Sequence, residues 1–164
     1  MWVIYLEMGV ALALLILIVW WTWPAKRAPS AVDINLVERV PLFRSLGAKR
    51  IAAVAGVLRS RRAKSGERLI RKGDQADSMY FIVSGEVEVD PEGGAPKGKL
   101  IEGDFFGEIA LIANRTRTAT ITTLTPCRLL VLHKPDFERF MDEHPDLKEA
   151  VSIAAKRRLE ELKA

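Results

Sequence analysis

Residues 103–122, GDFFGEIALIANRTRTATIT, carry the features on which the fold of this chain depends. The stretch opens with a turn pair, Gly103-Asp104, and two aromatic residues. Gly107 to Leu111 then read as one short helical turn, and alternating β-branched residues predict a strand from Thr118. A helix that starts after a glycine presents unpaired backbone N–H groups, here those of Glu108 to Ala110, and its dipole favours negative charge there. The stretch is therefore suited to hold an anion.

Glu108 and Arg117 are the charged residues that this stretch would offer to a ligand. Arg117, at the start of the strand, can bind a phosphate through a charge-assisted contact, whereas a carboxylate cannot. Glu108 would instead accept hydrogen bonds from a neighbouring hydroxyl group. A ribose phosphate meets both requirements. The alternative is that Glu108 and Arg117 form a salt bridge within a loop.

The string Phe106 to Leu111, followed by Arg117 to Thr120, resembles the phosphate-binding cassette of the cyclic nucleotide-binding domain family. The resemblance extends to residues 41–46 (PLFRSL) and 73–87 (GDQADSMYFIVSGEV). It covers the chain from about Asp33 to the C-terminus.

The resemblance implies a 3′,5′-cyclic nucleotide, cyclic AMP or cyclic GMP, as a regulatory ligand. Glu108 corresponds to the residue that binds the ribose 2′-hydroxyl in this family, and Arg117 to the residue that binds the cyclic phosphate. Thr118 would hydrogen-bond the phosphate of either nucleotide, and threonine there can also favour guanine, so the choice of base stays open. Thr116 departs from the family, whose members often carry proline there, which bears on the rigidity of the loop. The implied binding residues are Gly107, Glu108, Ile109, Ala110, Arg117 and Thr118.

Short alternating strands separated by turn residues fill the chain from about residue 61 to residue 133. This rhythm predicts a mainly β fold, an antiparallel jelly roll or β-barrel, with flanking helices within 33–58 and 135–162. In the first of these regions, Asp33 caps a short helix that ends before Pro41, and a second helix runs from 48 to 58. The expected strands are Arg68–Ile70, Met79–Ser84, Glu86–Val89, Lys99–Ile101, Thr118–Thr125 and Arg128–His133, and the C-terminal helices are Pro135–Glu143 and Pro145 to about Leu162.

The segment Trp2 to Trp23 is apolar apart from Glu7 and Thr22. As a helix it would be roughly 33 Å long, enough to cross a bilayer core. All four tryptophans of the chain lie at its two ends, which is typical of membrane interfaces. Lys26-Arg27 follow, which places the N-terminus outside and the rest of the chain in the cytoplasm. A cleavable signal peptide is the alternative, but bulky Trp-Trp-Thr-Trp-Pro ends the run where small residues would be required.

The expected organisation is a transmembrane helix at 1–23, a linker at 24–32 and a cyclic nucleotide-binding domain at 33–164. This describes a single-pass protein of the inner or plasma membrane, with residues 1–23 in contact with lipid and the domain in the cytoplasm. An unidentified protein effector would receive the signal, and a homo-oligomer also fits this organisation.

Composition argues against several other classes of protein. The formal net charge of +4 is mild and accompanies no nucleic-acid-binding motif, so nucleic acid is not an expected partner. The only histidines, His133 and His144, stand apart, and no nucleophile is visibly paired with a base, so neither a metal site nor an enzyme is expected. Cys127, the single cysteine, is expected to be a buried strand residue.

Two related classes of protein share such a domain. Catabolite-activator-like regulators need a helix-turn-helix after the long helix, and this sequence ends at Ala164. Cyclic-nucleotide-gated channels carry an apolar segment before the domain, but a filter stretch such as TVGYG is absent and the linker is short. The prediction is a membrane-anchored cyclic-nucleotide receptor, with a C-terminal fragment or subunit of a channel, and a non-binding scaffold domain, as alternatives.

The C-terminal helix is expected to act as a mobile lid over the nucleotide. Arg158 would contact the base, because an unpaired charge against the barrel is costly and a purine offers a ring face and acceptor atoms. The alternative is that Arg158 extends along the surface into water. Arg157, about 100° round the helix, is expected to face solvent. The helical stripe that motivates this prediction contains Leu147, Val151, Ala154, Arg158 and Leu162.

Overall fold

A computed structural model describes residues 32–44, 46–93 and 95–161 of the chain. The predicted transmembrane segment, residues 1–23, lies outside the described residues, as does all but the last residue of the predicted linker. No helix within the described ranges is long and apolar enough to cross a membrane. The helices are α2 (Ile34–Glu38), the 3-10 helix η1 (Pro41–Phe43), α3 (Ala48–Val57), α4 (Glu108–Ile112), α5 (Lys134–Glu143) and α6 (Pro145–Glu161).

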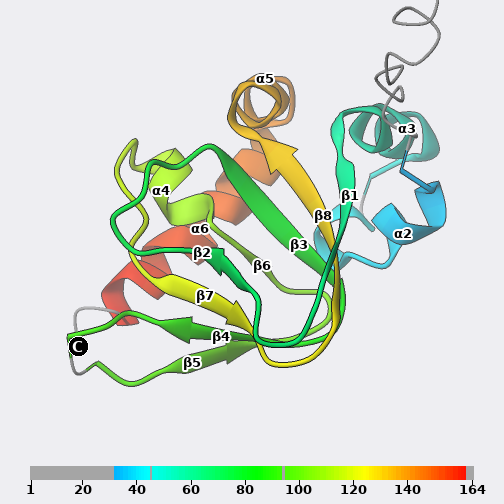
Figure 1. The fold of residues 1–164 in the computed structure, drawn as a ribbon. Coiled ribbons are helices and arrows are strands. Elements are labelled where there is room, and N and C mark those ends of the chain that lie inside the picture. The colour runs from blue at the N-terminus through cyan, green and yellow to red at the C-terminus, as the bar shows by residue number, and fades with distance from the viewer. Residues whose placement is uncertain (1–31, 45, 94, 162–164) are drawn as a thin grey trace, which may run out of the picture. The chain divides into compact units, whose positions relative to one another are not determined.

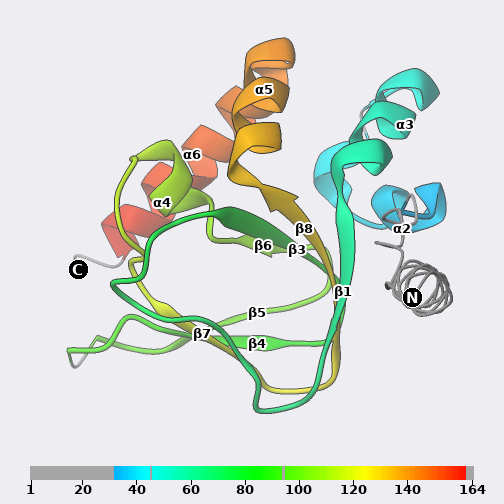
Figure 2. The ribbon, with the colours of Figure 1, turned by 45° about the horizontal axis from the view of Figure 1, so that its top comes forward.

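Two four-stranded antiparallel sheets form the β-roll that the sequence predicts (Figure 1). One sheet has the strand order β1-β8-β3-β6, and the other has the order β2-β7-β4-β5. In Figure 2 the sheets face each other, and α4, α5 and α6 lie on the outer side of the first sheet. The strands are β1 (Arg59–Ala63), β2 (Arg68–Ile70), β3 (Ser78–Ser84), β4 (Val87–Asp90), β5 (Gly98–Leu100), β6 (Phe105–Phe106), β7 (Thr120–Thr123) and β8 (Cys127–His133).

The central strands β3 and β8 are buried on both faces because they separate two hydrophobic cores. Tyr80 and Ile82 of β3 face the core between the sheets, together with Leu129 and Val131 of β8. The intervening residues face a second core beneath the helices. Burial of each large apolar side chain contributes about 1.5 to 3 kcal/mol to folding. The strand residues of the second core are Met79, Phe81, Val83, Leu130 and Leu132.

The N-terminal helices follow their sequence signals. Asp33 caps α2 by accepting a hydrogen bond of 3.0 Å from the backbone N–H of Asn35, as predicted. Helix α3 buries one face, through Ile51, Val54 and Ala55, in the core beneath the helices. These contacts hold α2 and α3 to the outer face of the first sheet.

Several strand boundaries differ from the prediction. β1 was not predicted as a strand because its residues, RSRRA, are almost all polar, and it is held by pairing with β8 from Arg59↔Val131 to Ala63↔Cys127. β7 ends at Thr123 and not at Thr125, because the next backbone N–H groups turn to the carbonyl of Glu86. β5 begins and ends one residue earlier than predicted. Phe105–Phe106, expected only as an aromatic pair, form β6 against β3.

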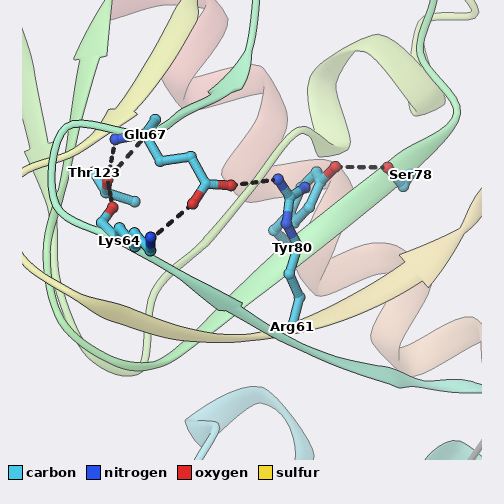
Figure 3. A network of polar contacts seen from close by, with 6 residues as sticks. All are labelled: Arg61, Lys64, Glu67, Ser78, Tyr80 and Thr123. Carbon is cyan, nitrogen blue, oxygen red and sulfur yellow. Dashed lines mark hydrogen bonds and ion pairs between the residues drawn. The ribbon is translucent and has the colours of Figure 1, made fainter.

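A polar network closes the turn between β1 and β2 (Figure 3). The Glu67 carboxylate accepts hydrogen bonds from the Arg61 guanidinium at 2.8 Å and from the Lys64 backbone N–H at 2.9 Å. These donors, the Lys64 N–H first, lower the pKa of Glu67. The Glu67 backbone N–H donates in turn to the Thr123 hydroxyl at 2.8 Å, which joins the turn to β7. Figure 3 also shows the Ser78 hydroxyl beside that of Tyr80, 3.2 Å away in β3.

Candidate functional site

Gly107 turns the chain from β6 into α4 by adopting a φ of 87°, in the left-handed region that favours glycine. A Cβ atom at this position would lie 2.8 Å from Nη1 of Arg117 and 3.2 Å from the carbonyl oxygen of Ser78. Since the glycine has no side chain to cap α4, the N–H groups of the first turn have no acceptor from the preceding residue. Gly107 is therefore required by both the backbone conformation and the close approach of Arg117.

Arg117 is buried, with only 4% of its side chain exposed, and its guanidinium is fixed from two directions. Nη1 donates to the carbonyl oxygen of Gly107 at 2.9 Å, and Nη2 donates to a carboxylate oxygen of Asp77 at 3.1 Å. The Arg117 backbone is bonded to the loop after β2, through the Asp74 carbonyl and the Gly73 N–H, both at 2.9 Å. Arg117 consequently lies in a loop before β7, and not at the start of a strand as predicted.

Glu108 is the most deeply buried carboxylate of the site, with a relative exposure of 1%. One of its oxygens accepts a hydrogen bond of 2.8 Å from Nη1 of Arg158 in α6. The same nitrogen donates to the carbonyl oxygen of Phe105 at 2.6 Å, and the guanidinium lies 4.9 Å from the centre of the Phe105 ring. Burial raises the pKa of Glu108, while the positive charges of Arg158 and Arg117 oppose the rise. This ion pair connects the last turns of α6 to the start of α4.

The alternative interpretation, a loop salt bridge between Glu108 and Arg117, does not hold: within the described part of the chain Arg117 pairs with Asp77 and Glu108 with Arg158. The predicted stripe of α6 is also displaced by one position, since Ala155 and not Ala154 is buried with Leu147 and Val151. The reason for expecting Arg158 on a base, an unpaired charge, falls away because Glu108 neutralises it.

A cavity of about 340 Å³ brings the predicted residues together. Its wall combines two kinds of surface. Charged residues, among them Glu108, Arg117 and Arg158, line it together with apolar residues such as Val89, Leu100 and Ile121. All the residues predicted from the sequence line it: Gly107, Glu108, Ile109, Ala110, Arg117, Thr118 and Arg158.

Sequence reasoning missed two residues that support the site from outside the cavity. Asp77 holds the Arg117 guanidinium, and Phe105 holds that of Arg158. Asp77 lies within residues 73–87, the second stretch that carries the family resemblance, so its position there was an available signal. The contact of Phe105 depends on a residue 53 positions away, and nothing local to Phe105 indicates it.

The arrangement can bind an oxyanion at one point and a hydroxylated group at another. A buried guanidinium with two fixed hydrogen bonds is preorganised for a phosphate. A buried carboxylate with lone pairs left over accepts further hydrogen bonds. The described residues contain no group of three or more His, Cys, Asp or Glu side chains suited to a metal ion.

The model of the cyclic nucleotide-binding domain family matches residues 60–144, just over half of the chain. The chain belongs to the cyclic nucleotide-binding domain family. The match includes the whole cassette segment, by which we mean residues 106–120, and ends before Arg158.

Curated relatives of this cyclic nucleotide-binding domain include bacterial channels. A putative potassium channel protein of Rhodopseudomonas palustris is 38% identical over 71% of the chain, which corresponds to 29% of the relative. A cyclic nucleotide-gated potassium channel of Rhizobium etli is 37% identical over 74% of the chain and 34% of the relative. The chain thus spans about a third of the length of these curated relatives.

Solved structures support the same fold. A domain described as PKAR CBD2 bound to Sp-2Cl-cAMPS superposes with a TM-score of 0.66 and 25% identity, covering 79% of this chain and 88% of that one. The regulatory domain of Toxoplasma gondii PKA, crystallised with cAMP, has the same TM-score and identity and covers 76% of this chain and 48% of that one.

Proposed function

We propose that the chain binds a 3′,5′-cyclic nucleotide, cyclic AMP or cyclic GMP, in the cavity behind the cassette segment, and that the ligand regulates a partner protein. The single observation that carries this proposal is that buried Arg117 and buried Glu108 line one cavity without pairing with each other. Asp77 holds Arg117 and Arg158 holds Glu108. Arg117 and Glu108 therefore each keep hydrogen-bonding groups for a separate part of the same ligand.

The phosphate would bind Arg117. Its guanidinium has five N–H donors, of which Asp77 and Gly107 each take one. The cyclic phosphate carries one negative charge and two free oxygens, which a guanidinium can bind as a fork. The N–H groups at the start of α4 and the Thr118 hydroxyl, which lines the cavity, would complete the contacts.

The ribose would bind Glu108. Because Arg158 occupies one carboxylate oxygen, the other stays able to accept from the 2′-hydroxyl. Glu108 would then contact the ligand and α6 at once. This double contact supports α6 as the element that transmits ligand binding to a partner, because a hydrogen bond from the ribose to Glu108 would change the strength of the Glu108–Arg158 ion pair.

The base would lie against the apolar wall, and Arg158, which also lines the cavity, stays a candidate contact for it. Both purines present flat apolar faces, so this wall accepts either. We keep the choice between adenine and guanine open, and we assign the chain a binding role and no catalytic one.

Residues 1–23 would anchor the receptor as a single-pass helix in the inner or plasma membrane, with the domain (33–164) in the cytoplasm. The support is the apolar run, the tryptophans at its ends and Lys26-Arg27. A second candidate function is the sensory part of a cyclic-nucleotide-gated channel, as fragment or subunit. The similarity to the channels of Rhodopseudomonas and Rhizobium favours it.

The first prediction is that Arg117→Gln abolishes nucleotide binding while the fold is retained. Loss of the charge-assisted pair should cost about 2 to 5 kcal/mol of binding free energy, at least tenfold in affinity. Isothermal titration of the full chain in detergent with cyclic AMP and cyclic GMP measures this, and circular dichroism checks folding. Arg115→Gln is the matched control, because Arg115 is exposed and does not line this cavity. Parent-like binding by Arg117→Gln would refute the site, and a folded parent that binds neither nucleotide would indicate a scaffold.

A further inference from the structure

A second cavity, of about 150 Å³, adjoins the first, since Ala110 lines both. Three segments distant in sequence form it: the loop between β2 and β3, the turn after α4, and the start of α5. Its polar lining residues are Gln75, Asn114, Arg115, Thr116 and Lys134. All of these side chains can donate hydrogen bonds, and none of the described lining residues is acidic.

The two cations of this cavity are incompletely neutralised. Arg115 makes no ion pair with any residue that the structure describes. Lys134 donates to the amide oxygen of Asn114 at 3.1 Å, and its nearest carboxylate, the exposed Glu138, is 3.8 Å away. An exposed pair at that distance contributes little. The lining therefore has an excess of positive charge.

Backbone contacts fix where these cations lie. The Lys134 N–H donates to the Asp77 carbonyl at 2.7 Å, which ties the start of α5 to the loop that also carries Gln75. The Arg115 N–H donates to the Ala110 carbonyl at 3.0 Å, which closes the turn after α4. Lys134 is also the first residue of α5, at the positive end of the helix dipole. Asp136, in the same turn, forms its ion pair with Arg139 and not with Lys134.

We propose that this second cavity is a binding site for a small oxyanion of the phosphate or sulfate type, held by Arg115, Lys134, Gln75 and Thr116. Two cations suit a doubly charged oxyanion, and the amide and hydroxyl donors suit its remaining oxygens. Because Arg115 and Thr116 are exposed, water competes for the same groups. We expect a dissociation constant on the order of 1 mM.

The test uses inorganic phosphate as the probe, with its ³¹P linewidth measured against the purified full chain in detergent. Phosphate can also bind Arg117 in the first cavity, so the measurement is made in the Arg117→Gln background. Addition of Arg115→Gln or Lys134→Gln should each reduce the phosphate-dependent broadening at least fivefold. Lys49→Gln is the matched control, because it removes one positive charge at an exposed position of α3, outside both cavities.

The outcomes separate this site from the nucleotide site. Broadening that survives Arg117→Gln and is lost with Arg115→Gln supports the second site, whether or not the chain binds cyclic nucleotides. Broadening lost with Arg117→Gln alone would assign phosphate to the first cavity and overturn the proposal. Equal loss with Lys49→Gln would show diffuse attraction to a positive surface and would also overturn it. Thermal unfolding of each variant verifies that the fold is intact.

Discussion

At the scale of single residues, the site depends on two neighbouring positions, the glycine Gly107 and the buried carboxylate of Glu108. Gly107 leaves room for the Arg117 guanidinium, and Glu108 follows it directly with a carboxylate that is almost completely buried. Gly107 therefore fixes the geometry of the cavity, and Glu108 contributes to its charge.

Gly107→Ala should destabilise the domain by about 1 to 3 kcal/mol, because alanine at a φ of 87° is strained and its Cβ would displace Arg117. Nucleotide affinity should fall as well. Gly56→Ala is the control: Gly56 lies in α3 with no atom within 4 Å of an added Cβ, and the change should stabilise by roughly 0.4 to 1 kcal/mol. Urea unfolding measures both, and an equal effect of the two substitutions would contradict the proposed role of Gly107.

Glu108→Gln should change how stability depends on pH. Burial raises the pKa of Glu108 above its ordinary 4.5, so the folded state binds a proton more readily than the unfolded state. Stability from this group is greatest at low pH and falls as the pH rises above about 4.5 through the raised value. The free energy of unfolding of the parent minus that of Glu108→Gln should therefore decrease between pH 4 and pH 7.

The control for this pH series is Glu149→Gln, since Glu149 is exposed on α6. The difference in the free energy of unfolding between the parent and Glu149→Gln should stay constant between pH 4 and pH 7. A Glu108 difference that increases with pH would mean that pairing with Arg158 outweighs desolvation. Glu108→Gln should also weaken nucleotide binding less than Arg117→Gln does, because an amide oxygen still accepts from the ribose.

At the scale of elements, α6 is held by apolar contacts at its beginning and by one ion pair near its end. Leu147, Val151 and Ala155 are buried, while Arg158 connects the last turns to Glu108 and Phe105. Arg157, one position earlier, has 80% of its side chain exposed, which confirms the predicted solvent-facing side. The C-terminal turns therefore depend on Arg158 more than the N-terminal turns do.

Arg158→Ala should loosen the end of α6 and weaken nucleotide binding by roughly 1 to 2 kcal/mol, because an ion pair with a buried carboxylate is lost. Hydrogen exchange over residues 155–161 should become faster, and the protection that nucleotide gives to this segment should shrink. Arg157→Ala removes the same charge from the exposed face and should leave both unchanged. If Arg158→Ala has the same hydrogen exchange and nucleotide affinity as the parent, and nucleotide still protects residues 107–110, the proposed binding site stands but the role of α6 as a lid is refuted.

Local sequence signals predicted most of the helices and strands but not the contacts between them. Short runs of strand-forming residues between turn residues predicted β3 and β8, and a glycine before a short apolar turn predicted α4. β1 gave no such signal, because its polar residues gain their strand conformation from pairing with β8. The Arg158–Glu108 pair joins positions 50 residues apart, and no periodicity encodes which acid an arginine will meet. Family resemblance supplied the cassette residues and the helical stripe supplied Arg158, whereas tertiary structure supplied their partners.

At the scale of the whole molecule, residues 1–23 are expected to hold the domain at the membrane. A tag placed after Ala164 should be protected from protease added outside intact cells, because Lys26-Arg27 orient the segment with its C-terminal side in the cytoplasm. The protein should remain in the membrane pellet after a high-salt wash. Replacement of Leu14, Leu15 and Leu17 by arginine is the control and should abolish pelleting. Release of a shortened protein without residues 1–23 outside the cytoplasm would establish a signal peptide instead.

The position of β8 between β1 and β3 has a consequence for how the domain is made. Both neighbours precede β8 in the chain, and each pairs with it along most of its length. During synthesis β1 and β3 therefore stay unpaired on this side until residues 127–133 have left the ribosome. Such long-range pairing slows folding, and the waiting strands expose apolar side chains of both future cores. A nascent chain stopped before Cys127 would thus be a substrate for chaperones or proteases, however complete its cassette segment already was.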